Sequence, residues 1–153
     1  EFGNCICGAA IEEGLFLRLR LTDDLQGFDL LLYDLKTNSK VTFPPLRLEG
    51  YNTGGDILIS PDGTLAVYAL ASVTPRPNQD PLTETVFVLV NLDAQTQTVL
   101  TDPIETFIRP IQWTEDNSAI LFTSPRDNGT WKVILSNGRL NRVAKTTFIG
   151  ILD

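Results

Sequence analysis

The sequence predicts an all-β fold made of about three four-stranded antiparallel β-propeller blades. Apolar and polar residues alternate at period two in stretches such as 15–21, which is the signature of a strand. Nine prolines and eleven glycines interrupt the chain at short intervals, and no segment shows a helical period. A turn also recurs: Gly14, Gly63 and Asn117 stand at equivalent places, 49 and 54 residues apart. Propeller blades repeat at about 40–50 residues.

Each unit reads as four strands in one order. A first strand ends in an acidic turn, a second follows at once, a loop leads to a third, and a tight turn leads to a fourth. The units cover about 3–45, 55–102 and 107–146, and the start of a further strand is expected over 147–153. The expected strands are 5–11, 15–21, 28–35 and 40–43 in the first unit, 56–59, 65–71, 85–92 and 98–100 in the second, and 108–113, 119–123, 131–135 and 140–144 in the third.

The acidic turns are structural devices. Asp62 can accept hydrogen bonds from backbone N–H groups of its own turn, and Gly63 takes a positive φ without a clash at Cβ. Gly14 occupies the same place in the first unit, and Asp116-Asn117 does so in the third. We expect these residues to shape the corners between strands rather than to act in catalysis.

The longest connections are 44–55 and the proline-rich stretch 74–81. Loops of propellers cluster on the rims, where partners meet the fold. Prolines also reduce the entropy that a loop loses on binding. Pro75, Arg76, Pro77 and Asn78 are therefore candidate partner-binding residues. A plain surface insertion is the alternative.

Composition limits the functions that the chain can have. Its 153 residues suffice for a sizeable core, and the absence of histidine excludes a Ser-His-Asp or Cys-His arrangement and an imidazole metal site within the chain. No catalytic, cofactor or metal residues are predicted. A net charge of −7 disfavours nucleic-acid binding, and no apolar run is long enough to span a bilayer. Methionine is absent, including at position 1, so we expect a processed product or part of a longer protein. The sequence given has no signal peptide, and a targeting signal could lie upstream of it.

The middle unit resembles a known family. Its stretch 59–68, Ile-Ser-Pro-Asp-Gly-Thr-Leu-Ala-Val-Tyr, is similar to the signature of TolB-type, WD-like propeller repeats, and the pieces 32–37 and 90–93 resemble the third strand and exit turn of that family. The first unit lacks Ser-Pro, and the third has Glu115-Asp116-Asn117 in place of Pro-Asp-Gly. The resemblance implies a non-enzymatic scaffold or protein-binding module of the cell envelope, hence an extracellular, periplasmic or cell-surface location.

Further residues could carry function. Arg18 and Arg20 share one face of a strand, and they either dock to an acidic neighbour or are solvated surface arginines. Cys5 and Cys7 would lie on one side of a strand, where buried thiols are favoured over a two-sulfur metal site and the redox state is open. Asn128 begins an Asn-Gly-Thr glycosylation sequon at the tip of a hairpin that is similar to an Asp box. Asp23, Asp24 and Asp29 lack the spacing of a calcium loop.

Three blades are fewer than the roughly four to eight of a closed propeller. We expect either a segment of a longer propeller or self-association, for example two copies that close a six-bladed ring. The alternative function is a substrate-gating propeller segment of a prolyl-oligopeptidase-like hydrolase whose catalytic domain lies outside this chain. The sequence gives less support to a propeller that acts on carbohydrates, since Trp113 and Trp131 fall in strands, where tryptophan ordinarily packs in the core.

Overall fold

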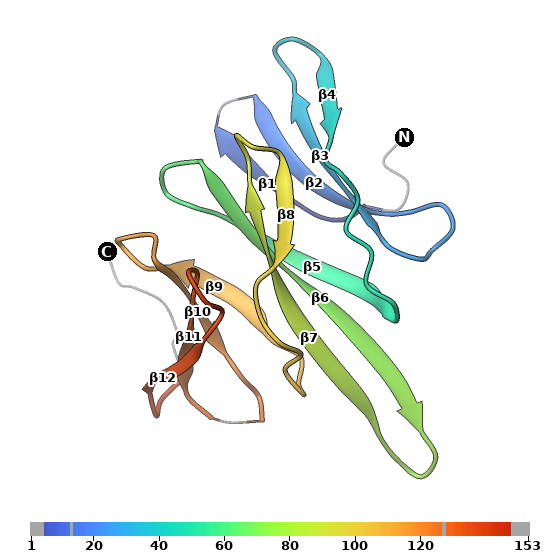
Figure 1. Cartoon of the computed structure of the whole chain (residues 1–153), viewed down its shortest axis with the longest axis vertical. Helices are drawn as coiled ribbons and strands as arrows, with labels where there is room; N and C mark the ends of the chain where they lie inside the picture. Colours follow the sequence, from blue (N-terminus) through green and yellow to red (C-terminus); the bar gives the residue numbers. More distant parts are fainter. Residues whose placement is uncertain (1–4, 13, 127, 148–153) are drawn as a thin grey trace.

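The computed structural model describes residues 5–12, 14–126 and 128–147, and the side chains of residues 5–7 are not described. Within these residues the chain forms twelve strands in three sheets (Figure 1). The first sheet consists of β1 (Cys5–Glu12), β2 (Leu15–Leu21), β3 (Phe28–Asp34) and β4 (Ser39–Thr42). The second consists of β5 (Tyr51–Ile59), β6 (Leu65–Arg76), β7 (Gln79–Asn91) and β8 (Thr96–Val99). The third consists of β9 (Arg109–Trp113), β10 (Ala119–Thr123), β11 (Thr130–Ile134) and β12 (Leu140–Ala144).

Every sheet is an antiparallel meander, with its strands paired in chain order. The sheets contact one another through their first strands: β1 lies against β5, and β5 lies against β9. Four-stranded meanders that meet along their first strands are the arrangement of propeller blades. The predicted fold class is therefore confirmed, and we call the three sheets blades 1, 2 and 3.

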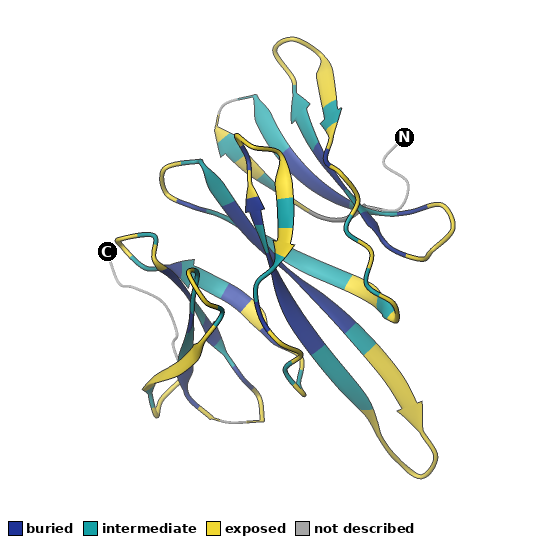
Figure 2. Cartoon of the chain, viewed as in Figure 1, coloured by how far each residue is buried: buried dark blue, intermediate teal, exposed yellow. Residues whose placement is uncertain are grey.

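The core consists of two layers, one on each side of blade 2. Along β6, Tyr68 and Leu70 pack in the layer shared with blade 1, together with Leu17 and Leu19 of β2. The alternate residues Val67 and Ala69 pack in the layer shared with blade 3, together with Trp113, Ile120 and Phe122. Successive side chains of a strand point to opposite faces, so a strand covered on both faces is apolar throughout. Figure 2 shows the resulting dark centre and the exposed outer strands.

Blade 2 is longer than expected. Strand β5 begins at Tyr51 rather than at residue 56, and β6 and β7 extend as a paired hairpin to Arg76 and Gln79. The prediction of a loop over 74–81 was wrong, because strands β6 and β7 continue through Pro75 and Pro81, with a register shift at which neither proline has a paired partner. Across this shift β7 has one residue more than β6, so the bulge lies on β7 at Asp80-Pro81, opposite Pro75.

The expectation of two solvated arginines was wrong for Arg18. Arg18 lies in the middle of blade 1, opposite Gly8 on β1 and Leu31 on β3, and is 7% exposed. Arg18 can be buried here because its neighbour Gly8 is small and because the stem of the arginine side chain is aliphatic. Arg20 is nearer the end of the strand and pairs with Asp29 at 2.9 Å.

Other expectations fall partly outside the described residues. Strand β1 includes Cys5 and Cys7 with a register shift between them, and nothing is described of their side chains. Of the further strand expected over 147–153, only Thr147 is described. Across the described ranges, no helix is long and apolar enough to cross a membrane.

Candidate functional site

The acidic corners lie on one rim of the arc, where the first strand of a blade meets the second. In blade 2, Asp62 Oδ1 accepts hydrogen bonds from Ser60 Oγ at 2.6 Å, Thr64 N at 3.1 Å and Thr64 Oγ1 at 2.9 Å. In blade 3, Asp116 Oδ1 accepts from Thr114 Oγ1 at 2.7 Å and from the backbone and hydroxyl of Ser118. Gly14, Gly63 and Asn117 have φ of 89°, 72° and 54°. The three corners therefore share a left-handed residue, and two share a carboxylate network.

These hydrogen bonds favour the ionised carboxylates. The Ser60 hydroxyl, followed by the backbone and side chain of Thr64, lowers the pKa of Asp62 to about 2. A smaller effect comes from the side chain of Asn117 in the next corner. The Thr114 and Ser118 hydroxyls lower the pKa of Asp116 to about 2. A carboxylate held ionised by its own turn suits a structural role and is unsuited to taking a proton at neutral pH.

The opposite rim carries the β6–β7 hairpin, which projects beyond the other strands (Figure 1). Its strands pair from Leu65 and Asn91 out to Arg76 and Gln79, and Pro77 and Asn78 form the turn. Asn78 has a φ of 57°. Proline followed by a residue of positive φ is the arrangement of a type II turn. The dipeptide Pro77-Asn78 was therefore a hairpin signal that the sequence analysis missed.

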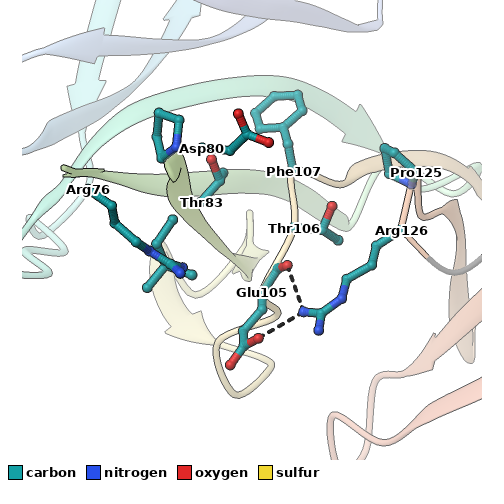
Figure 3. A pocket seen from close by; sticks show the side chains of 10 residues that line it. Arg76, Asp80, Thr83, Glu105, Thr106, Phe107, Pro125 and Arg126 are labelled. Carbon is teal, nitrogen blue, oxygen red and sulfur yellow. Dashed lines mark hydrogen bonds and ion pairs between the residues drawn. The ribbon is translucent and has the colours of Figure 1, made fainter. Parts of the chain in front are cut away.

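A groove lies between this hairpin and blade 3 (Figure 3). Its volume is about 640 Å³, within the roughly 300–1,000 Å³ that ligand sites occupy. One wall comes from Arg76 and the stretch 80–83 of the hairpin. The other comes from 105–107, which connects blades 2 and 3, and from Pro125 and Arg126 in the β10–β11 loop. The connection is held in place because Thr85 Oγ1 donates to the Thr106 carbonyl at 2.8 Å.

The groove combines charges of both signs with apolar surface. Arg126 Nη1 lies 2.8 Å from Glu105 Oε2, and Figure 3 shows this ion pair at the groove wall. The Arg126 guanidinium lowers the pKa of Glu105, and the more distant charge of Arg76 acts in the same direction. Phe107 is 38% exposed, and Arg109 lies over its ring. Such a wall offers groups for ion pairs, hydrogen bonds and apolar contacts with a bound molecule.

The structure divides the predicted site residues among three places. Arg76 lines the groove, while Pro75, Pro77 and Asn78 belong to the exposed end of the same hairpin. Asp62, Gly63, Asp116, Asn117 and Gly14 belong to the corners, and Arg18 and Arg20 to blade 1. The sequence analysis missed Thr83, Glu105, Thr106 and Phe107. Nothing in their local sequence distinguishes them, since blade packing alone brings the segments together.

The remaining candidate residues make contacts that indicate structural roles. Trp113 is 4% exposed and its indole N–H donates to the Leu58 carbonyl at 3.3 Å, so it is a core residue that joins blades 2 and 3. Trp131 is half-buried, with Arg142 over its ring. Asp24 accepts the hydroxyl of Thr22, much as Asp62 accepts that of Ser60. Asn128 is exposed, and its carbonyl accepts a hydrogen bond from Arg142.

Comparison with known proteins supports the fold and goes no further. No family model matches the chain, and no curated protein sequence matches it. Among solved structures, the chain is similar to the crystal structure of the tricorn protease, with a TM-score of 0.53 and 11% identity. The match covers 92% of this chain and 13% of that one, so the present chain corresponds to a small part of the larger protein.

Proposed function

We propose that the chain is a segment of a larger β-propeller assembly and acts as a non-enzymatic, polypeptide-binding module. The observation that supports the proposal is the groove between the β6–β7 hairpin and blade 3, which carries ionic, hydroxyl and apolar groups on a projecting rim. Propeller rims are common places of recognition. In keeping with the TolB-type resemblance, we place the protein in the periplasm, outside the cell or at the cell surface.

Selection of peptides tests the binding function. A random-peptide library displayed on phage is selected on the purified chain, and the enriched peptides are synthesised and titrated by fluorescence anisotropy. We expect enriched peptides whose affinity falls at least about tenfold in Phe107→Asp, which alters the groove wall, and is unchanged in Leu35→Asp on the far blade. Lack of enrichment, equal binding by both variants, or cleavage of the peptides would contradict the proposal.

The partly exposed apolar face of blade 3 supports the assembly part of the proposal. The outer face of blade 3 carries the partly exposed Leu121 and Ile134, and blade faces are ordinarily covered by a neighbouring blade. We propose that additional blades or a second copy cover it. Light scattering at increasing concentration should give a mass above the 16.9 kDa of one chain, or a chain of low stability without its neighbours. A stable monomer would contradict this part.

The second candidate is a propeller segment that admits substrates to a protease. The similarity to part of the tricorn protease supports it. The full open reading frame distinguishes the two candidates. A catalytic domain encoded beside the blades favours the protease, and further blades alone favour the binding module.

A further inference from the structure

The outer edge of β7 near the hairpin tip has no strand beside it. Strand β8 pairs with β7 only from Val88 to Asn91, and Thr85 forms a single bridge with Ile104. Between Gln79 and Glu84, the described residues include no neighbour on that side of β7. The open edge lies along the groove, which Asp80, Pro81, Leu82 and Thr83 line from the hairpin.

The two-residue period of a strand shows which backbone groups point to this edge of β7. Thr85 N–H donates to the Ile104 carbonyl at 2.9 Å, and Ile104 N–H donates to the Thr85 carbonyl at 2.9 Å. Backbone groups of an antiparallel strand alternate between its two edges. Thr83 therefore presents its N–H and its C=O to the groove. A bound strand would continue the ladder that Ile104 begins.

From this edge we propose that the groove binds an extended peptide by strand addition to β7, with Thr83 as the central donor and acceptor and a carboxylate of the peptide beside Arg76. The inference rests on the proposed polypeptide-binding function and states how that binding occurs. Strand addition supplies affinity through main-chain hydrogen bonds, and the groove walls supply selectivity for side chains.

A single extended peptide fits this edge better than a second copy of the chain. Proline on an edge strand is a known protection against pairing between sheets, because it lacks a donor. The opposite wall at Phe107 and Pro125 leaves a groove rather than an open sheet edge.

Arg76 is the group that favours an acidic peptide. It lies on the groove wall, where its charge acts on Glu105 from a distance, and among the described residues it forms no salt bridge. The other arginine of the groove, Arg126, is already paired with Glu105. A carboxylate in the bound strand would give Arg76 the ion pair that Arg126 has within the chain.

Backbone variants at Thr83 test strand addition. The probe is the synthetic form of the most enriched phage-displayed peptide. Thr83→Pro removes the edge N–H, and Thr83→Val keeps it together with the β-branched shape. We expect an affinity loss of about tenfold or more for Thr83→Pro and less than about threefold for Thr83→Val. Equal affinity of Thr83→Pro and the wild type overturns strand addition, while peptide binding itself can still stand.

Two further measurements keep the test decisive if Thr83→Pro does not fold. In the wild type, hydrogen exchange at the Thr83 amide should slow about tenfold or more with the probe bound, and unchanged exchange overturns the proposal.

Changing the acidic residue of the probe to its amide should weaken binding to the wild type and leave binding to Arg76→Gln unaltered. An equal effect on both chains overturns the role of Arg76. One further outcome overturns the proposal: the wild type and Thr83→Val form a dimer, Thr83→Pro does not, and the peptide has no effect on the dimer. In that case the edge of β7 pairs with a second copy of the chain.

Discussion

The carboxylates of Asp62 and Asp116 each accept bonds from a hydroxyl two residues before them and from a residue two positions after them. Both side chains are exposed, yet both have a folded-state pKa of about 2. The ordinary value for aspartate is 3.8. Local hydrogen bonds produce this difference, and it links the stability of the corners to pH.

Stability should therefore fall in acid. Since the folded-state pKa lies below the ordinary value, the contribution of each carboxylate is complete above about pH 4 and is lost as the pH falls toward about 2. We expect Asp62→Asn, which keeps an acceptor oxygen without the charge, to lower the urea midpoint at about pH 7 and to show a smaller decrease at about pH 3 than the wild type. Asp93→Asn, an exposed aspartate outside the corners, is the control. Parallel pH curves for all three chains would contradict the assignment.

Gly138, at the boundary of blades 2 and 3, is a second residue at which a substitution should affect stability. Gly138 has a φ of 66°, and a Cβ at this position would lie 2.0 Å from the Leu100 carbonyl oxygen. Gly138→Ala should lower the free energy of unfolding by more than about 2 kcal/mol, from backbone strain and overlap together. At Gly55 a Cβ would meet nothing within 4 Å, so Gly55→Ala is the matched control. Urea unfolding of both variants measures the difference, and equal stability would contradict the close approach.

At the scale of the strands, the exposed end of the β6–β7 hairpin should contribute to binding and little to stability. Residues 73–81 are exposed, and the two core layers begin only nearer the middle of the strands. Replacing residues 75–81 by Asn-Gly joins the paired residues Thr74 and Leu82 through a two-residue hairpin turn. We expect the free energy of unfolding to change by less than about 1 kcal/mol, and peptide binding to be lost. A destabilised chain, or unchanged binding, would show that the hairpin has another role.

The elements also show where sequence reasoning succeeds and fails. The corners at Asp62-Gly63 and Asp116-Asn117 could be located because their chemistry is local: a short polar side chain and a left-handed residue fix the turn. Pro75 and Pro81 pointed to a loop, but proline is tolerated in a strand where its nitrogen, which carries no hydrogen, does not face a neighbouring strand, and this depends on tertiary structure. The groove could not be predicted, since Glu105 and Arg126 approach the hairpin only through the packing of blade 3 on blade 2.

Over the whole molecule, blade 2 is the element to which the others attach. Phe87 of β7 is fully buried in the layer between blades 2 and 3, and its ring meets that of Phe122 edge-on at 5.4 Å. Phe87→Ala should cost about 3–5 kcal/mol, because it opens a cavity between blades. Leu35→Ala is the control, since Leu35 is 70% exposed and lies far from this layer. Calorimetry should show one shifted transition if the blades unfold together, and an unaltered main transition would contradict a shared core.

The central claim is that blades 1 and 3 cover opposite faces of blade 2, and residue-resolved hydrogen exchange of the intact chain tests it most directly. We expect the slowest amides in Ala66–Leu70 and Val86–Val90, where both faces are buried, and fast exchange in β4, β8, β12 and the hairpin tip. Fast exchange throughout β6 and β7, with the slowest amides in an outer blade, would contradict the arrangement.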